Sequence, residues 1–571
     1  MSSLVKKTIK GKQYFYIVDS KRVNGKPKIV NQIYVGAVDA VIDMLKDIKG
    51  ASAPVYSSDF EFGASAALYD LALRLDIVGR IDRIAPKRLQ GLTVGQYLLT
   101  AMINRALCPV SKSGIEQWYS GSILSRLMPV SKGQLSCQRF WDNMDNWTVQ
   151  DIRRFEDEFV PFLVRQYGLQ TRCLVYDATN FFTYIDTDNE KAGLAKRGHN
   201  KEKRNDLRII GLSLMVTEED EIPLFYETYE GNRPDCDQFR ETAGLLSERY
   251  RKMFGEEPDI TLIFDRGNNS AESVQLLKGE DGGLNIHYVG GLKQAQCPEL
   301  YAVPKADYQT LPEEEFRGTS AYRRDIHALG QEVTAVITNN PELVRGQLRG
   351  ILRNRQKCVQ ELKELQENLE QWERGEKKKG RKPTRESVEK KISRILSKEY
   401  MDRLIIIEWE DEGRKYPQFH ASEPESRLLE LEEKELGKTV LFTDQTNWET
   451  EKIVHAYRSA WHIEAVFRQM KDTAHLSVRP IRHWTDQKIQ VHIFCCVQAY
   501  RLCRLLKREL SDLGIHMSID RILENLSEKK QYIHYYQKTR GLRESYSMSK
   551  CDDEIEEIIC KLGLEKYRLL S

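Results

Sequence analysis

The chain has 571 residues, of which 40% are hydrophobic, so its length predicts about three or four domains with sizeable cores. Lys and Arg total 87 against 85 Asp and Glu, which leaves a formal net charge of only +2. Without a global positive field, a protein that merely coats nucleic acid is disfavoured. The low net charge does not disfavour an enzyme that has local basic patches and an acidic site.

The cysteines and the N-terminus are typical of a protein from a reducing compartment. The 11 cysteines contain no Cys-x-x-Cys pair, which argues against a zinc site and against a disulfide framework. Reduced thiols suit the cytosol. The N-terminus lacks the apolar core of a signal peptide, and no stretch of 18 apolar residues occurs. We therefore expect a cytoplasmic protein with no membrane partner.

Two small units are expected before the first sheet domain. Residues 1–50 contain two β-rich runs on either side of a turn signal at 24–27, which predicts a small β unit. Residues 60–165 then carry apolar side chains at helical spacing, and helix breakers divide them into several helices. This helical domain could hold a helix-turn-helix, although a purely structural bundle is equally compatible with the pattern.

Residues 166–295 have the pattern of an α/β domain. The expected elements, in order, are strands at 173–177, 207–216 and 222–229, a helix at 235–253 and a strand at 260–264. Antiparallel strands followed by a crossover helix are compatible with a mixed sheet flanked by helices. The fold class that we expect is therefore α/β.

Residues 296–436 interrupt this pattern with a helical hairpin. Apolar residues recur alternately three and four positions apart from Leu348 to Trp372, with Arg355 as the one polar member, which predicts a heptad seam. The basic segment 374–383 would form the tip of the hairpin. It could be a solvated loop or a contact to phosphate, and the pattern leaves both interpretations open.

A strand is also expected at 404–407, within residues 296–436. Residues 437–510 are expected to hold a strand at 439–443 and helices at 448–472 and 485–510, and residues 511–571 are expected to form a helical tail.

Two carboxylates follow apolar strands of the predicted sheet. Asp177 and Asp265 each stand where such a strand is expected to end. Ligand-binding groups in open sheets commonly lie at the carboxyl ends of strands, and neighbouring strands could bring the two carboxylates together. An Asp at a strand end is also a common turn former or helix cap, so the position alone does not decide.

One predicted helix combines an acid, a phenol and two cations on a single stripe. At about 100° per residue, Tyr457, Glu464 and Lys471 share a face, and Arg468 lies about 40° from Glu464. The stripe suits a metal ion beside a phosphate backbone. The alternative is a salt-bridged surface helix with an ordinary ion pair between Glu464 and Arg468. Periodicity leaves both readings open.

Taken together, these motifs resemble DDE transposases of bacterial insertion sequences, in the superfamily with the Tyr-Arg-Glu-Lys signature helix. The resemblance covers residues 165–300 and 437–505 well, and the ordered set of motifs is specific. The motifs that carry it are Leu174–Asn180, Arg197–Leu207, Gly231–Asn232 with Asp235, Phe264–Gly267, Gly437–Asp444, the helix with Tyr457, Glu464, Phe467, Arg468 and Lys471, and Arg479–His483 followed by His492.

The resemblance implies a fold and a set of metal ligands. The family has a ribonuclease-H-like core, so residues 166–295 and 437–510 would be its two parts, separated by a large insertion. Asp177, Asp265 and Glu464 would bind two Mg²⁺ ions per active site, with Mn²⁺ as an alternative. Hard divalent ions prefer oxygen ligands, and two ions roughly 4 Å apart can assist both the attacking and the leaving oxygen.

The resemblance also implies DNA contacts. Tyr457 and Lys471 would contact phosphates near the cut, and Arg468 is added because it lies on the same stripe. His199, Lys201 and Arg204 could line DNA, although a solvated polar loop is the interpretation that their sequence favours. The helical domain 60–165 is the candidate for binding DNA ends.

Two residues of the signature helix need separate comment. The signature has an arginine three residues after its tyrosine, and here that position is Ala460. Arg458 points about 160° away from Ala460 on a helix and is a poor substitute. Trp461 could stack on a flipped base, but we expect it to be buried in the core.

The function implied is that of a transposase which binds the terminal inverted repeats of its element and target DNA. It would act as a homodimer in the synaptic complex, nucleoid-associated in a bacterial cytoplasm. It would cut strands at the element's ends and transfer them into target DNA. The alternatives are a metal-dependent nuclease or recombinase with the same core, and an inactive DNA-binding remnant, which Ala460 would favour.

Overall fold

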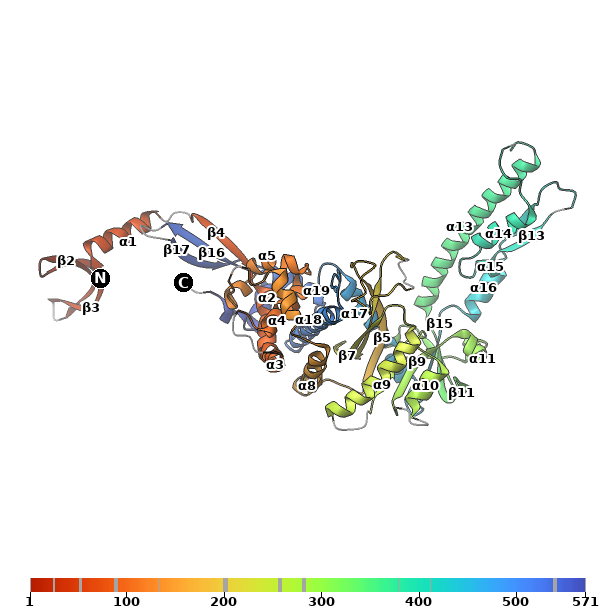
Figure 1. Cartoon of the computed structure of the whole chain (residues 1–571), viewed down its shortest axis with the longest axis horizontal. Helices are drawn as coiled ribbons and strands as arrows, with labels where there is room; N and C mark the ends of the chain where they lie inside the picture. The colour runs from red at the N-terminus through yellow and green to blue at the C-terminus, as the bar shows by residue number, and fades with distance from the viewer. Residues whose placement is uncertain are drawn as a thin grey trace. The chain divides into compact units, whose positions relative to one another are not determined.

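The protein is described by a computed structural model, drawn in Figure 1. The structure describes residues 2–23, 26–50, 54–86, 91–131, 133–198, 204–254, 259–279, 284–377, 379–410, 412–537 and 542–569. The chain divides into two compact units, each described by itself below. The first unit comprises Met1–Glu156, Phe181–Gly193 and Arg468–Ser571, and the second comprises Asp157–Asn180 and Leu194–Phe467.

The second unit is built on one mixed sheet in the order β10-β11-β12-β15-β9-β8-β5-β6-β7. Its centre is parallel, because β8 pairs in parallel with β5 and with β9. The outer pairs, β6 with β7 and β11 with β12, are antiparallel. The strands are β5 (Cys173–Phe182), β6 (Ile209–Thr217), β7 (Pro223–Glu230), β8 (Thr261–Ile263), β9 (His287–Leu292), β10 (Gln309–Thr310), β11 (Ser320–Ala328), β12 (Gln331–Asn339) and β15 (Lys438–Thr443).

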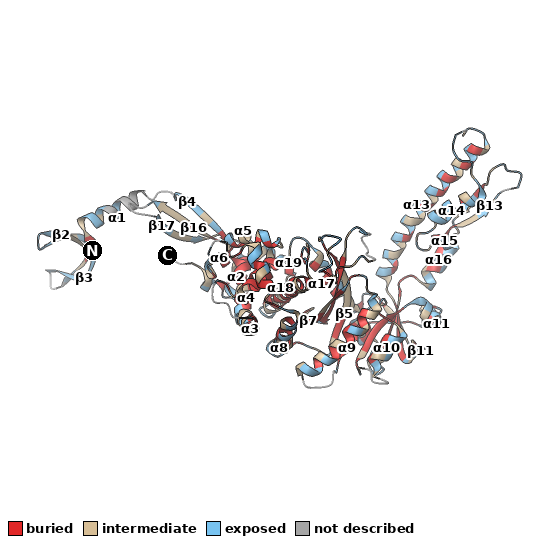
Figure 2. Ribbon diagram, in the orientation of Figure 1, coloured by how far each residue is buried: buried red, intermediate tan, exposed pale blue. Residues whose placement is uncertain are grey.

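Apolar sequence explains why these segments are central strands. Every residue of β6 is buried, as are Leu174 to Tyr176 of β5, so these runs need cover on both faces of the sheet. Figure 2 shows this burial along the sheet. The helix α9 (Asp235–Phe254) packs on the sheet through Phe239, whose ring lies 5.0 Å from that of Tyr176 and 4.8 Å from that of Phe264. The prediction of a mixed sheet with helices is confirmed.

Several short elements complete the sheet's surroundings. They are α10 (Ala271–Lys278), η3 (Gln294–Gln296), α11 (Pro298–Tyr301), η4 (Lys305–Asp307), α12 (Glu313–Phe316) and the long helix α17 (Thr450–Lys471). Two strand boundaries differ from the sequence-based expectation. The strand β5 continues to Phe182, so Asp177 lies inside it rather than at its end. Leu404 ends the helix α15 (Met401–Leu404), and the strand predicted at 404–407 begins only at Ile406.

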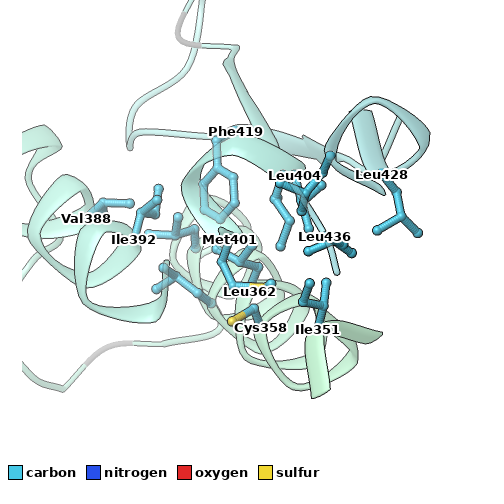
Figure 3. Packing of buried hydrophobic residues seen from close by; sticks show 14 of the residues in the cluster. Ile351, Cys358, Leu362, Val388, Ile392, Met401, Leu404, Phe419, Leu428 and Leu436 are labelled. Atoms are coloured by element: carbon cyan, nitrogen blue, oxygen red, sulfur yellow. The ribbon is translucent and has the colours of Figure 1, made fainter. Parts of the chain in front are cut away.

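The predicted helical hairpin is present and has a core of its own. It pairs α13 (Pro341–Glu373) with α14 (Arg385–Ile395), and the buried side chains of α13 follow the predicted seam from Ile351 to Trp372. Figure 3 shows Cys358 and Leu362 of α13 gathered with Val388 and Ile392 of α14. Among the described residues, α15 adds Met401 and Leu404 to this core, and β13 (Ile406–Trp409), β14 (Phe419–Ser422) and α16 (Glu425–Lys434) complete it.

The polar interruption of the seam has a structural explanation. Arg355 is only 18% exposed and lies 3.5 Å from a carboxylate oxygen of Glu423 and 3.4 Å from one of Glu425. A buried guanidinium is tolerated where carboxylates pair with it. The heptad prediction is therefore confirmed, with its single exception accounted for.

The first unit contains helices around a buried central helix, α18 (Asp486–Asp512), which packs against α2 and α4. Cys495 and Cys496 lie within it and are buried. The other elements before residue 168 are β1 (Ser2–Ile9), β2 (Lys12–Val23), β3 (Lys26–Ala37), α1 (Val38–Gly50), β4 (Tyr56–Glu61), α2 (Gly63–Arg74), α3 (Ile77–Ile84), α4 (Val94–Leu107), η1 (Lys112–Gly114), α5 (Ile115–Ser120), α6 (Leu124–Leu127), α7 (Cys137–Met144) and α8 (Val149–Tyr167).

The expectation of a helical tail over residues 511–571 was wrong. It holds α19 (Ile519–Glu528), α20 (Asp553–Lys561) and η5 (Leu564–Tyr567), but also a hairpin of β16 (Lys530–Gln537) and β17 (Leu542–Met548). The strand β16 pairs antiparallel with β4, so that Ile533 faces Ser58. Because β4 is so distant from β16 in sequence, no local pattern in the tail could predict this pairing.

Within the described part of the chain, no helix is both long enough and apolar enough to cross a membrane.

Candidate active site

One pocket of the second unit gathers the three predicted carboxylates. Its volume is about 290 Å³, and Asp177, Asp265 and Glu464 all line it. They come from β5, from the loop after β8 and from α17, three segments far apart in sequence. The wall also includes Tyr176, Thr338, Asn340, Leu343, Thr439, Leu441, Val454, Tyr457, Arg458, Ala460, Trp461 and Ile463.

The parallel pairing of two strands explains why the aspartates converge. In the register of β5 with β8, Val175 stands opposite Ile263. Two residues further along each chain are Asp177 and Asp265. Adjacent strands lie about 4.8 Å apart, so both carboxylates fall at the same edge of the sheet.

Local hydrogen bonds orient the two aspartates. One carboxylate oxygen of Asp265 accepts the backbone N–H of Gly267 at 2.8 Å and the side-chain amide of Asn268 at 3.1 Å. A Cβ on Gly267 would stand 3.1 Å from that oxygen, so the turn favours glycine. The Asp177 carboxylate accepts the N–H of Ala178 at 2.7 Å. Asp265 is exposed and Asp177 half-buried.

Glu464 enters from the exposed side of α17. Ile463 and Val466 are buried, whereas Glu464 is exposed and lines the pocket. The helix thus packs through its buried apolar stripe and carries the Glu464 carboxylate on a different, exposed stripe, as helical periodicity allows.

Tyr457 packs closely beside the aspartates. Burial raises the pKa of its hydroxyl, while Arg266 acts in the opposite direction. A Cβ on Gly291 of β9 would lie only 2.5 Å from the Tyr457 hydroxyl oxygen, so the phenol occupies the space that this glycine leaves. The neutral phenol is therefore a rigid hydrogen-bond donor at the pocket wall.

Arg458 also lines the pocket, although helical geometry made it a poor substitute for the missing arginine at Ala460. Its guanidinium donates to the Thr319 hydroxyl at 2.8 Å and lies 4.9 Å from the centre of the Phe316 ring. The residue thus borders the pocket while its guanidinium is held by Thr319, in agreement with its position on the helix away from Ala460. Burial lowers the pKa of Arg458.

The expectation that Trp461 is buried in the core was wrong. Its side chain is 61% exposed and lines the pocket. Buried neighbours on α17, such as Val454 and Ile463, supply the apolar face, so the helix does not need the indole for packing.

The remaining predicted DNA contacts are not gathered in this pocket. Arg468 and Lys471 stand in the last turn of α17, which belongs to the first unit, and Lys471 lies 5.6 Å from the centre of the Phe181 ring. Arg204 is exposed and donates to the Asp206 carboxylate at 2.8 and 2.7 Å, which lowers the pKa of Asp206 to about 2. His199 and Lys201 lie outside the described residues.

The donor set is suited to divalent ions that prefer oxygen. Three carboxylates and several hydroxyl or amide oxygens line the pocket. Among the residues that the structure describes, no three His, Cys, Asp or Glu side chains come close enough to surround a single ion. A two-ion arrangement does not require such a triad, because each ion can be held by two carboxylates with one shared.

Several wall residues escaped the sequence analysis. Thr338 and Asn340 lie at the end of β12 and the start of α13, within the segment predicted to be an insertion. They reach the pocket because β12 pairs with β15 in the central sheet. A local pattern carries no signal for such a pairing.

Fold and pocket together define the class of protein: a mixed α/β protein with an acidic pocket open to solvent. The model of the transposase DDE domain family matches residues 168–499, more than half of the chain, and the chain belongs to this family. It is therefore a transposase of the kind that cleaves and transfers DNA. Among solved structures, the chain is similar to the cryo-EM structure of a piggyBac transposase synaptic complex with hairpin DNA. The identity is 10% and the TM-score 0.36, over 81% of this chain and 79% of that chain. No curated protein sequence matches significantly.

Proposed function

We propose that the pocket holding Asp177, Asp265 and Glu464 is the catalytic site of an active DNA transposase, built on a ribonuclease-H-like core. The observation that carries this proposal is the convergence of these carboxylates, from two neighbouring parallel strands and one helix, on one pocket. Acids brought together from distant segments repel one another, so their collection favours a role in binding cations.

The three carboxylates would hold two divalent ions, Mg²⁺ or Mn²⁺. Such ions, when bound, lower the pKa of a coordinated water and stabilise the charge on a leaving oxygen. Asp265 is kept in place by Gly267 and Asn268, so its orientation does not depend on the substrate. Preorganised ligands of this kind reduce the rearrangement needed when the substrate binds.

The cationic and phenolic groups would position DNA. Tyr457, in the pocket, can donate to a phosphate oxygen, and Arg458 places a second donor group at the same wall. Lys471 and Arg468 are proposed phosphate contacts on the last turn of the same helix. Water would attack at the end of the element to free a 3′ hydroxyl, which would then attack target DNA. We propose that a homodimer carries out both reactions on paired inverted repeats.

The direct test uses the purified full-length protein, a duplex with the terminal inverted repeat of its own element, and a target plasmid. We expect nicking and joined product with Mg²⁺ and neither with EDTA. Asp177→Asn, which keeps the shape of the side chain, should reduce nicking by about 10²-fold or more, as loss of a charge-stabilising group at such a site does. Asp188→Ala removes an exposed acid outside the pocket and is the matched control.

The outcomes separate the candidate functions. Nicking without joined product would identify a nuclease with the same core. Equal nicking by wild type and Asp177→Asn would mean that the pocket is not the active site. Binding of the repeats with no cleavage under any metal condition would identify an inactive DNA-binding remnant.

A further inference from the structure

A second pocket, in the first unit, is lined by side chains that the catalytic proposal does not use. It has a volume of about 190 Å³. Its walls come from the end of α4, the loop that leads into η1, the helix α7, the segment after α17 and the helix α18. The lining residues are Arg105, Val110, Ser111, Lys112, Ser113, Cys137, Trp141, Pro480, Arg482, His483 and His492.

The inner wall of this pocket is made of buried basic side chains. Arg105 is 2% exposed, Lys112 and His483 are each 7% exposed, and His492 is 1% exposed. Buried cations are uncommon in proteins unless they are paired. Two cations, Arg105 and Lys112, buried beside two histidines around one small cavity therefore call for a counter-charge.

The described part of the chain supplies no such counter-charge. Lys112 has no hydrogen bond or ion pair with any described residue, and its nearest recorded partner is the Phe140 ring, with the centroid 5.8 Å away. Neither ring nitrogen of His483 has a hydrogen-bond partner, nor has Nδ1 of His492. Arg105 donates to backbone carbonyls, among them those of Ser477 and Arg479, but to no carboxylate of the described residues.

The electrostatic environment agrees with this geometry. Burial, followed by the charge of Arg105, lowers the pKa of Lys112 to about 8. Burial lowers the pKa of His483 far below its usual value, and Lys112, Arg105 and Lys488 add to this effect. The charged groups that act on the pocket's basic side chains are other cations and cysteine thiols, with no carboxylate among the described ones.

The lining identifies the chemistry of the missing partner. A metal ion is disfavoured, because Lys112 and Arg105 would repel it. An anion would pair with both and could accept hydrogen bonds from the Ser111 and Ser113 hydroxyls, which lie 2.8 Å from one another. The cavity is several times larger than the space that a single water needs, so a phosphate group fits with some of its hydration.

The rim suggests that this phosphate is attached to a nucleotide. Trp141 is 40% exposed and Arg482 is exposed, and both line the mouth. An exposed indole beside a cationic cavity can stack on a base or sugar while the cavity holds the adjoining phosphate.

We propose that this pocket binds a backbone phosphate of DNA, which gives the first unit an anchoring contact of its own. The family match makes DNA the partner class, and the proposal does not depend on the cleavage reaction.

The first test measures the salt dependence of DNA binding. Fluorescence anisotropy with a labelled duplex, in EDTA so that no cleavage occurs, gives log K against log[KCl]. Each phosphate contact contributes about 0.9 to the slope, so Lys112→Met should reduce the slope by about one and weaken binding severalfold for every sequence. Lys112→Arg, which keeps the charge, should retain more of the slope than Lys112→Met does. Lys550→Met, an exposed lysine of the same unit, is the control.

The second test separates DNA phosphate from free phosphate. Inorganic phosphate, compared with chloride at equal ionic strength, should raise the thermal midpoint of the wild type but not that of Lys112→Met. Stabilisation by inorganic phosphate with an unchanged DNA slope would overturn the assignment to DNA. No effect in either experiment would overturn the anion site altogether. Because Lys112→Met removes an unpaired charge, the variant is expected to fold, and Arg482→Ala at the exposed mouth provides an independent second variant.

Discussion

Lys112→Met should make the protein more stable at neutral pH, although it changes a buried residue. The pKa of Lys112 falls from its ordinary 10.5 to about 8 in the folded protein. At about 1.4 kcal/mol per pKa unit, holding the charged form in the fold costs about 3 kcal/mol below pH 8. Methionine has a similar length and no charge, so most of this cost should disappear.

The pH dependence gives the prediction its distinctive form. Because the folded pKa lies below the unfolded pKa, the unfolded chain binds more protons between pH 8 and 10.5, and wild-type stability relative to Lys112→Met should rise across that window. The advantage of the variant should thus be largest at pH 7 and vanish near pH 10.5. In the presence of a bound anion, the advantage at pH 7 should shrink, because the wild-type charge is then paired.

Urea unfolding followed by pulse proteolysis, with fragments assigned to each unit, measures this difference at pH 7 and pH 10.5. The exposed Lys550→Met should change stability by less than about 0.5 kcal/mol at either pH. A Lys112→Met protein that is less stable than wild type at pH 7, by an amount that does not vary with pH, would refute the reasoning. It would mean that Lys112 has a favourable partner within the fold.

Three further predictions follow from other contacts. Glu156→Ala should lower the free energy of unfolding by about 3–5 kcal/mol, because Arg501, which is only 1% exposed, then loses the carboxylate that pairs with it. The double variant Glu156→Leu, Arg501→Leu should recover most of that loss, as measured by urea titration. Ala460→Arg should add a cation to the proposed catalytic pocket and raise the slope of log K against log[KCl] for DNA binding by about one. An unchanged slope would show that the position does not contact phosphate. Gly291→Ala should force Tyr457 from its place and reduce the nicking rate by about 10²-fold in a protein that remains folded, as circular dichroism would verify.

The sequence predicted the parts of the fold that depend on local pattern. The heptad seam of α13 follows directly from apolar spacing, and burial of its members bears this out. The strands that precede Asp177 and Asp265 are recognisable as apolar runs, and their parallel pairing brings the two acids together, as expected for neighbouring strands. Glu464 is different, because periodicity alone left a surface ion pair equally acceptable and only the family resemblance selected it.

What escaped prediction depends on contacts between distant segments. The pairing of β16 with β4 joins the two ends of the chain, so the tail was expected to be helical throughout. Trp461 was expected in the core because tryptophan is usually buried, but α17 already has enough apolar surface. The basic pocket of the first unit combines residues from five segments. In the sequence, His483 and His492 stand out only as parts of a motif, and no local pattern indicates that Lys112 lies beside them.

The hairpin that grows out of the central sheet leaves and returns at neighbouring points. Asn339 of β12 stands opposite Lys438 of β15, and the N–H of Asn340 donates to the carbonyl of Gly437 at 2.9 Å. Gly437 has a φ of +76°, and a Cβ there would meet Val344 at 2.3 Å, so glycine is required at this junction.

Residues 340–437 are thus grafted onto a β-hairpin and carry their own hydrophobic centre. Protein design could replace residues 340–437 by a short turn or by another module, while β12 and β15 keep their pairing register. Since Asn340 and Leu343 also line the pocket that holds Asp177, Asp265 and Glu464, the base of the module forms part of the wall of that pocket. Exchanging the part of the module beyond this stem would therefore change its surface while the pocket wall formed by Asn340 and Leu343 stays in place.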